Sequence, residues 1–191
     1  MEPQLTISVP AFVAELVAQA GELDTDEARM RLAIALAGTN VERGGGPFGA
    51  VVCSGSRVVA AGVNRVLASG LSIAHAEIVA IMHAQHVLRG TTASEPLALF
   101  TSTEPCCQCF GAIVWSGIAR LVCGAVTADA EAIGFDEGPK PDAWSAELAR
   151  RGIEVKERVC QDEARAVLAE YARRGGPIYG LRHPTVTKPP A

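Results

Sequence analysis

The segment TEPCCQCFGAIVW, residues 103–115, places three cysteines within four positions behind a proline. Cys106 and Cys109 are three residues apart in what reads as the first turn of a helix, so their sulfurs lie on one face and can share a metal ion. Helix N-terminal N–H groups favour thiolate over thiol, which metal binding and redox chemistry both need. Cys107 is rotated by about 100° on an ideal helix and is expected to face elsewhere. The Cys-x-x-Cys spacing alone leaves open a zinc site and a thioredoxin-like redox pair.

A His-x-Glu pair, His75 and Glu77, begins another predicted helix upstream. Helices that follow parallel strands start at the carboxyl edge of the sheet, where sites usually form, so the two helix starts can meet there. His75, Cys106 and Cys109 would then surround one ion, and three protein ligands leave the fourth tetrahedral position for water. Glu77 could bond that water and carry its proton. A redox pair needs neither residue, so the combination favours a catalytic zinc site.

Each of these residues also has a simpler interpretation when it is taken alone. His75 could be a helix cap, and Glu77 an acid that complements the helix dipole. The cysteines could be small core residues, which is the role we expect for Cys53 and Cys123 inside apolar strands. Only the full set of residues at this spacing favours the zinc site over these alternatives.

Composition excludes several classes of function. The chain has 191 residues and reads as one domain over 1–191, with its core at about 25–180 and a loose C-terminal tail. A net charge of -4 with scattered Lys and Arg predicts no nucleic-acid surface. Apolar runs are too short for a membrane span, and the N-terminus lacks the pattern of a secretory signal. We therefore expect a cytoplasmic protein whose six cysteines stay reduced.

Hydrophobic periodicity and turn residues predict the elements that must position these side chains. A helix is expected at 25–43 and a β-hairpin within 47–64, and a second helix at 74–90. The elements expected after them are a strand at 97–103, a helix at 106–117, a strand at 120–126, a helix at 142–152, a strand at 153–159 and a helix at 162–176. Strands that alternate with helices after an initial hairpin predict an α/β layered sandwich with several parallel strands.

The segments that carry a family resemblance cover nearly the whole chain. They are GGPFGAVV, AGVNRV, AHAEIVAI, TSTEPCCQCFGAIVWSG and EAIGFDEGPKP. The His-x-Glu and Pro-Cys-x-x-Cys motifs among them resemble those of the cytidine deaminase-like superfamily of zinc deaminases. VWSG and IGFDEGP look like the bacterial guanine deaminase branch, including forms that also accept aminotriazines such as ammeline. The resemblance implies a three-layer α/β sandwich with a central five-stranded mixed sheet, and a homodimer, in some members with exchanged C-terminal segments.

The same resemblance implies roles for individual residues. His75, Cys106 and Cys109 match the ligands of a Zn²⁺ ion, and Glu77 matches the catalytic acid/base. Glu137 matches a second acid that moves a proton to the leaving amine. The residues that match substrate contacts are Phe48, Asn64, Ala76, Trp115 and Tyr179, and Tyr179 could reach the pocket of its own chain or of the partner.

The implied reaction is zinc-dependent hydrolytic deamination of a free purine base, guanine to xanthine and ammonia, with an aminotriazine as a further substrate. Deamination of guanosine, cytosine, cytidine or a pterin stays open, because pocket shape decides among them. A tRNA adenosine deaminase would need a basic surface, which this chain lacks. An inactive zinc-binding scaffold subunit is the non-enzymatic alternative, and the presence of Glu77 argues against it.

Overall fold

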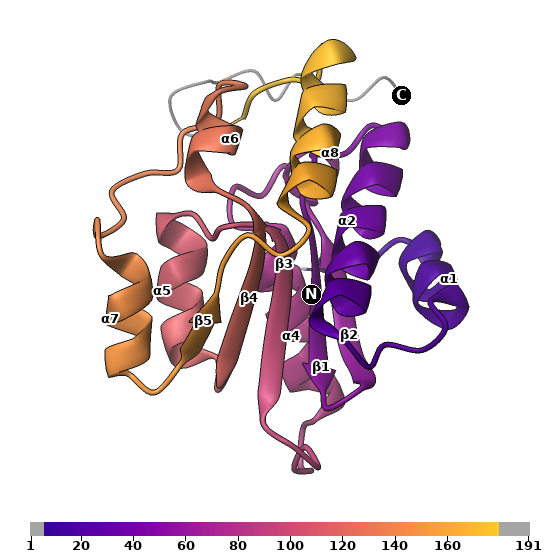
Figure 1. Ribbon diagram of the computed structural model, residues 1–191. Coiled ribbons are helices and arrows are strands. Elements are labelled where there is room, and N and C mark those ends of the chain that lie inside the picture. The colour runs from indigo at the N-terminus through magenta and orange to yellow at the C-terminus, as the bar shows by residue number, and fades with distance from the viewer. Residues whose placement is uncertain (1–5, 180–191) are drawn as a thin grey trace, which may run out of the picture.

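A five-stranded mixed sheet forms the centre of the molecule in a computed structural model that describes residues 6–179 (Figure 1). The strands are β1 (Gly49–Ser54), β2 (Arg57–Val63), β3 (Leu97–Thr103), β4 (Arg120–Ala125) and β5 (Glu154–Lys156), in the spatial order β2-β1-β3-β4-β5. β1 pairs antiparallel with both β2 and β3, whereas β3, β4 and β5 run parallel to one another. The predicted hairpin is the β1–β2 pair, which turns at Gly55 with a φ of +59°.

Helices cover both faces of the sheet. On one face lie α1 (Ala11–Gln19), α2 (Asp26–Glu42) and α8 (Gln161–Arg173). On the other lie α4 (Ala76–Val87), α5 (Cys107–Trp115) and α7 (Trp144–Arg150), while α3 (Val66–Ser69) and α6 (Thr127–Glu131) are short. Successive strand residues point to opposite faces, so each strand contributes to both hydrophobic cores. Val51 and Cys53 pack in the first core, and Ala50 and Val52 pack in the second. The three-layer α/β sandwich predicted from the sequence is confirmed.

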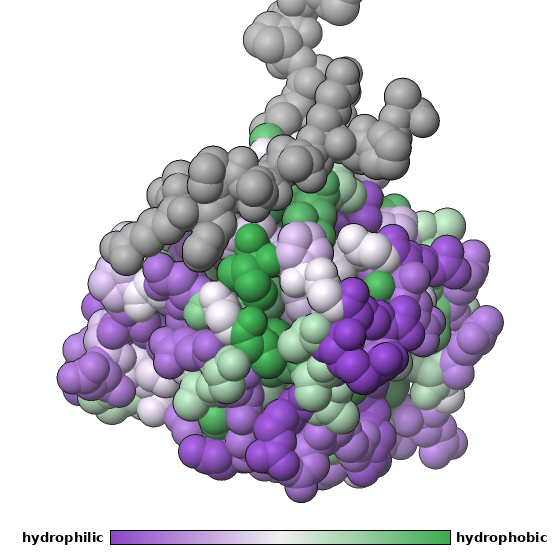
Figure 2. Space-filling view, turned by 90° about the horizontal axis from the view of Figure 1, so that it is seen from above, coloured by the Kyte–Doolittle hydropathy of each residue, from purple (hydrophilic) through white to green (hydrophobic). Residues whose placement is uncertain are grey.

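The direction of the strands explains where a site can form. Because β1 is antiparallel to both of its neighbours, β2 runs in the same direction as β3 and β4, and the carboxyl ends of all three meet at one edge. The segments that lead into α4, α5 and α6 begin at this edge. The edge lies at the top of Figure 1 and faces the viewer in Figure 2, where apolar residues gather in a narrow band among polar ones.

Three helices of the structure are absent from the sequence prediction, namely α1, α3 and α6. α1 precedes the expected start of the core, yet Phe12 and Val13 are buried against α2 and the sheet. The predicted C-terminal tail from residue 180 onward lies outside the described residues. None of the helices within residues 6–179 combines the length and apolar character that crossing a bilayer requires.

Candidate active site

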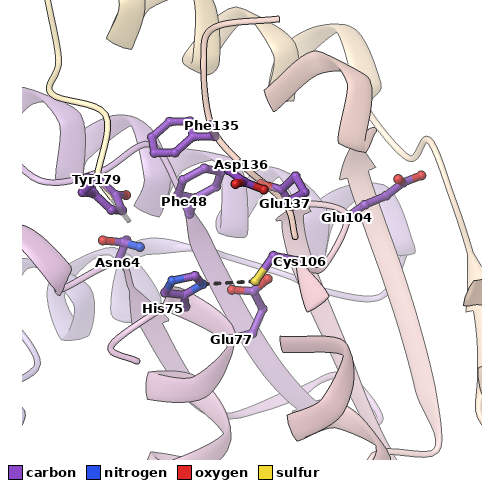
Figure 3. Close-up of a pocket in the computed structure, with 10 residues that line it drawn as sticks. All are labelled: Phe48, Asn64, His75, Glu77, Glu104, Cys106, Phe135, Asp136, Glu137 and Tyr179. Carbon is purple, nitrogen blue, oxygen red and sulfur yellow. Dashed lines mark hydrogen bonds between the residues drawn. The ribbon is translucent and has the colours of Figure 1, made fainter. Parts of the chain in front are cut away.

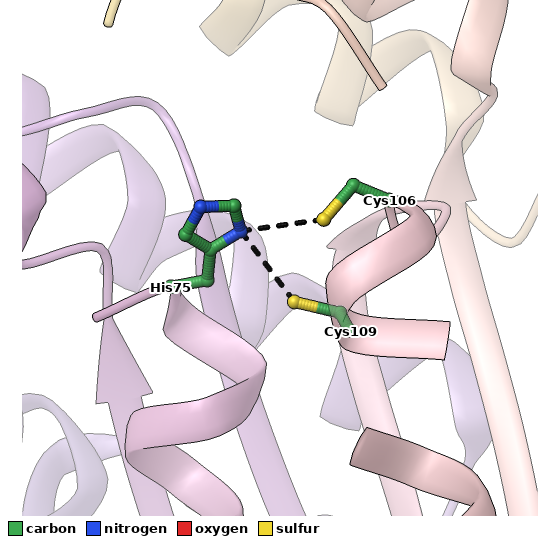
Figure 4. Close-up of side chains that lie close together, drawn as sticks. All are labelled: His75, Cys106 and Cys109. Atoms are coloured by element: carbon green, nitrogen blue, oxygen red, sulfur yellow. Dashed lines mark hydrogen bonds between the residues drawn. The ribbon is translucent and has the colours of Figure 1, made fainter. Parts of the chain in front are cut away.

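Two helix N-termini at the carboxyl edge carry the three predicted metal ligands (Figure 4). His75 is the N-cap residue of α4, which follows β2 and α3. Cys106 is the N-cap residue of α5, directly after β3, and Cys109 lies one turn into the helix. The imidazole therefore approaches the two thiols from a neighbouring helix. Neither the hairpin nor the β3–α5 unit could assemble this group alone.

The three side chains lie as close together as a single zinc ion requires. His75 Nδ1 is 3.4 Å from Cys106 Sγ and 3.5 Å from Cys109 Sγ, and all three ligand atoms lie within 4.8 Å of one another. Tetrahedral zinc with Zn–S bonds of about 2.3 Å and Zn–N bonds of about 2.0 Å places its ligand atoms roughly 3.5–3.8 Å apart. Two thiols and one imidazole are also the donor set that zinc prefers. The group therefore fits a zinc ion with three protein ligands.

Cys106 is already biased toward the thiolate that a metal ligand must be. The hydrogen bond from Cys109 and the contact with His75 lower the pKa of the Cys106 thiol to about 4, although burial acts in the opposite direction. Cys107, as expected from its helical position, is not part of the group. Its sulfur packs against Gly138, where a side chain would have no room.

A cavity opens beside the ligand group (Figure 3). Its lining residues come from the segment before β1, the ends of β2 and β3, the starts of α4 and α5, the loop after α6 and the segment after α8. They are Phe48, Asn64, His75, Glu77, Glu104, Cys106, Phe135, Asp136, Glu137 and Tyr179. Five of the predicted substrate-binding or catalytic residues thus share one cavity with two of the predicted metal ligands.

Glu77 and Glu137 are two of the three buried glutamates that line this cavity, the third being Glu104. Burial raises the pKa of Glu77, and a negative charge on Cys106 adds to the effect. Burial also raises the pKa of Glu137 to about 8, with the charges of Cys106 and Glu77 acting in the same direction and Lys140 acting against it. A carboxyl group whose pKa is raised toward neutral pH is better able to donate a proton as well as accept one, which is what general acid–base catalysis requires.

Asn64 is buried at the end of β2 and has a fixed orientation. Its Oδ1 accepts a hydrogen bond from Val66 N at 3.1 Å, so its amide NH₂ group remains to donate to a bound molecule. The buried Asn40 of α2 donates from Nδ2 to the carbonyl of Asn64 at 3.0 Å and to that of Gly46 at 2.8 Å. Asn40 therefore holds the backbone that carries Asn64, a role that the sequence analysis missed.

Aromatic rings form another part of the cavity wall. Phe135 packs edge-on against Phe48, with ring centroids 5.0 Å apart, and against Tyr179 at 5.1 Å. Tyr179 is buried in the cavity of its own chain, and its hydroxyl has no hydrogen-bond partner within the described part of the chain. A buried hydroxyl without a partner is costly, so it is available to a ligand.

Two predicted substrate contacts lie elsewhere. Trp115, at the end of α5, is 87% exposed and does not line the cavity within the single chain, so its contact with the substrate stays a prediction. Trp115 is the last residue of α5, which begins at the ligand group and runs away from it. Ala76 is fully buried between two lining residues, and its side chain packs in the second core, so only its backbone is placed to meet a ligand.

Three residues of the cavity wall, Glu104, Phe135 and Asp136, are absent from the site predicted from the sequence. Phe135 directly precedes the acidic pair of GFDEGP and could have been read as the apolar anchor of that loop. Glu104 directly precedes the proline of the metal motif. Its carboxylate points away from Cys106 and accepts hydrogen bonds from Thr127, at 2.9 Å from N and 2.7 Å from Oγ1 (Figure 3).

Comparison with known proteins agrees with this geometry. The family model of the cytidine and deoxycytidylate deaminase zinc-binding region matches residues 23–125. The guanine deaminase of Bacillus subtilis (strain 168) is 40% identical over 112 residues, which cover 58% of this chain and 71% of that protein. A crystal structure of a variant of NE0047 in complex with 8-azaguanine superposes with a TM-score of 0.85 and 41% identity, covering 91% of this chain and 98% of that one.

A structure of guanine deaminase from Nitrosomonas europaea superposes with a TM-score of 0.82 and 40% identity, covering 91% of this chain and 98% of that one. The matched family region contains all three predicted metal ligands and Glu77. The chain therefore belongs to the cytidine and deoxycytidylate deaminase family, and its similarity to guanine deaminases confirms the branch predicted from the sequence.

Proposed function

We propose that this protein is a zinc-dependent aminohydrolase that converts guanine to xanthine and ammonia. The observation that carries the proposal is the cavity in which the ligand group meets two buried carboxyl groups and Asn64. The relatives include guanine deaminases, and one structural neighbour was solved in complex with 8-azaguanine. Ammeline or a related aminotriazine is the further substrate that we expect.

His75, Cys106 and Cys109 would hold the zinc ion, which supplies when bound the acidity that turns water into a nucleophile near neutral pH. Glu77 lines the cavity two residues after His75. We infer that its carboxylate accepts the proton of the attacking water and delivers it to a ring nitrogen of the base. Its raised pKa suits both halves of this transfer.

Glu137 has the second protonic role in the proposal. The exocyclic amine must gain a proton before it leaves as ammonia, and this nitrogen lies apart from the ring nitrogen that Glu77 serves. Glu137 enters the cavity from a separate loop, and its raised pKa keeps it protonated near neutral pH. Glu137 can therefore donate a proton to the amine, while Glu77 transfers the proton of the attacking water to the ring nitrogen.

Recognition of the base falls to Asn64, the aromatic wall and Tyr179. The free NH₂ group of Asn64 can donate to an acceptor of the purine, and the unpartnered hydroxyl of Tyr179 can bond a second polar edge. Phe48 and Phe135 supply an apolar surface for the flat ring. Buried polar groups that a ligand satisfies discriminate strongly against ligands that lack the matching atoms.

Conversion of guanine to xanthine, followed by ultraviolet absorbance together with ammonia release, tests the proposal. We expect turnover by the zinc-loaded protein and loss of turnover after chelation, with recovery when zinc is restored. Glu77→Gln should keep zinc but lose on the order of 10²-fold or more in kcat. Full zinc occupancy without turnover of guanine or of any other free base would favour the scaffold alternative.

We also propose that two copies of the chain pair through α4 and α5. Four large apolar side chains on or beside these helices are exposed: Ile73, Met82, Val87 and Trp115. Exposed large apolar side chains, tryptophan above all, are typical of an interface between subunits. Trp115→Glu should therefore shift the mass measured by light scattering from dimer to monomer, and a monomeric wild-type protein would contradict the pairing.

Two expectations about the whole protein remain proposals. Exchange of C-terminal segments concerns residues beyond Tyr179, which lie outside the described range. The cytoplasmic location is supported by the six cysteines, which are all free thiols within the described residues, because a reducing compartment keeps thiols unpaired.

A further inference from the structure

The loop between α6 and α7, residues 132–143, carries Glu137 and also contains a buried lysine, Lys140, that bonds to residues outside the loop. The side chain of Lys140 is only 7% exposed. Its Nζ donates to the carbonyl oxygen of Pro105 at 2.8 Å and to Oγ1 of Thr127 at 2.8 Å. The ammonium also lies 4.7 Å from the centre of the Trp144 ring.

These contacts compensate little for burying the charge of the Lys140 ammonium, so a contribution to stability alone does not explain its burial. The two close acceptors are neutral oxygens, and the carboxylate in the ion pair, Glu104, is 4.0 Å away. Glu104 itself is already bonded to the backbone and side chain of Thr127. Removing an ammonium from water costs several kcal/mol, and apolar residues of similar volume often serve stability as well. A buried lysine here is better explained by the geometry that it imposes.

That geometry joins the second carboxyl group to the metal motif. Pro105 directly precedes the metal ligand Cys106, and Lys140 is three residues after Glu137. A backbone hydrogen bond, donated by Cys107 N to the carbonyl oxygen of Glu137 at 2.9 Å, joins the same two segments as the lysine contact. The lysine therefore adds a side-chain anchor on the far side of Glu137, where the loop continues toward α7.

The loop needs such an anchor because the glycines on either side of Glu137 give its backbone unusual conformational freedom. Gly134 and Gly138, with φ values of +106° and +70°, adopt backbone conformations that residues with side chains rarely reach. Gly138 approaches Cys107 so closely that any side chain at this position would collide with the sulfur. Lys140 is the residue through which this glycine-bracketed turn is bonded to both the β3–α5 junction and the start of α6.

We propose that Lys140 is a positioning residue that holds the Glu137 carboxyl against the substrate by fastening its loop to Pro105 and Thr127. The inference rests on the proposed deamination, because it assigns a purpose to the placement of Glu137. Lys140 does not line the cavity and so touches no substrate. Its loss should affect the transfer that Glu137 performs and should leave binding by Asn64 and Tyr179 unchanged.

The test compares Lys140→Met with wild type on guanine. Methionine keeps an unbranched stem of similar length against Trp144 but removes the ammonium. We expect kcat to fall by about tenfold or more, because a small misplacement of a catalytic group is costly, while KM changes by less than about threefold. Zinc content should stay at that of wild type. Lys156→Met, which removes an exposed lysine on β5, is the matched control and should leave kcat unchanged.

A double-mutant cycle separates positioning from a general structural effect. If Lys140 acts through Glu137, then Lys140→Met should cause no further loss of kcat in a Glu137→Gln background. An equal loss in both backgrounds would overturn the inference, as would a wild-type kcat for Lys140→Met or a loss of its zinc. Thr127→Val, which removes one of the two close acceptors, should show the same pattern at smaller size and carries the test if Lys140→Met does not fold.

Hydrogen–deuterium exchange keeps this inference distinct from the proposed activity. Amides of residues 132–143 should exchange faster in Lys140→Met than in wild type, whether or not guanine is the substrate. Unchanged exchange would overturn the anchoring role, whereas a wild-type protein that is inactive on guanine would overturn only the proposed activity.

Discussion

Glu137→Gln is the substitution that most sharply divides the proposed roles of the two carboxyl groups. Glutamine keeps the shape and the buried position of the side chain but cannot transfer a proton. Glu137 is buried in the cavity wall, and its backbone carbonyl is bonded to Cys107 N, a bond that the substitution leaves intact. The variant should therefore fold and bind zinc, and any loss of rate reports on the proton alone.

The size of the effect follows from the raised pKa of Glu137. A carboxyl with a pKa of about 8 is protonated in roughly nine molecules of ten at pH 7, whereas one at the ordinary value of 4.5 is protonated in about one of 300. The shift, of which burial is the largest cause, thus increases the acid form at pH 7 by about 300-fold. Loss of a positioned general acid costs 10² to 10⁴ in rate, so we expect Glu137→Gln to lose roughly 10²-fold or more in kcat.

The pH profile gives a second signature of the same group. Wild-type kcat should fall about tenfold per pH unit above pH 8, because the acid form is lost there, and this alkaline limb should be missing from Glu137→Gln. The folded pKa lies above the unfolded one, so the stabilising contribution of this carboxyl is complete below about pH 4.5 and is lost as the pH rises through about 8. Glu137→Gln should accordingly unfold at a higher temperature than wild type at pH 9.

Steady-state deamination of guanine between pH 6 and pH 10, with zinc content measured on the same samples, provides the assay. Glu131→Gln is the matched control, because this acid is exposed and lies outside the cavity wall, and Asp136→Asn tests the exposed acid that lines the cavity next to Glu137. Each should lose far less than Glu137→Gln. A near-normal kcat for Glu137→Gln would refute the reasoning and leave Glu77 as the only carboxyl group in the mechanism.

Three further predictions concern the metal, the base and the stability of the fold. Cys106→Ser should lose the zinc that wild type holds at about one ion per chain, while Cys107→Ser should keep both zinc and activity, as measured by atomic emission and ammonia release. Asn64→Ala should lower kcat/KM for guanine by on the order of 10²-fold with zinc retained, because base polar groups lose their partner; an unchanged value would remove Asn64 from recognition. Arg120, bonded at 2.6 Å and 2.8 Å, holds the pKa of Asp26 well below its usual range, so Asp26→Asn should destabilise the fold by about 2 kcal/mol near pH 7. This stabilisation is present above about pH 3.8 and is lost as the pH falls further, so the difference in melting temperature should shrink in acid, and a difference independent of pH would contradict the assignment.

The regular part of the fold could be predicted because it depends on local patterns. The helix predicted at 25–43 is α2, whose N-cap Thr25 accepts a hydrogen bond from Ala28 N at 3.1 Å, and the hairpin predicted within 47–64 turns at Gly55. α1 was missed because its N-cap is a proline without a side-chain bond and its first turn lacks acidic residues. Its place is secured by burial of Phe12, which is a tertiary effect.

The site residues, too, divide into those that local sequence patterns predict and those that depend on tertiary packing. His75, Cys106 and Cys109 lie at helix starts, and strand direction brings helix starts to one edge, so motif spacing together with the predicted parallel strands was enough to group them. The exposure of Trp115 could not be read from the sequence, because packing decides which face of α5 is covered. Asn40 acts through backbone carbonyls far along the chain, and no motif marks such a role.

The central claim is that this chain deaminates a free purine base, and a substrate panel tests it most directly. Zinc-loaded protein should be assayed for ammonia release from guanine, guanosine, cytosine, adenine and ammeline at one pH, with kcat/KM measured for each. We predict the highest value for guanine, a lower but measurable value for ammeline, and little turnover of the other three. A kcat/KM for guanosine or cytosine about tenfold above that for guanine would contradict the account.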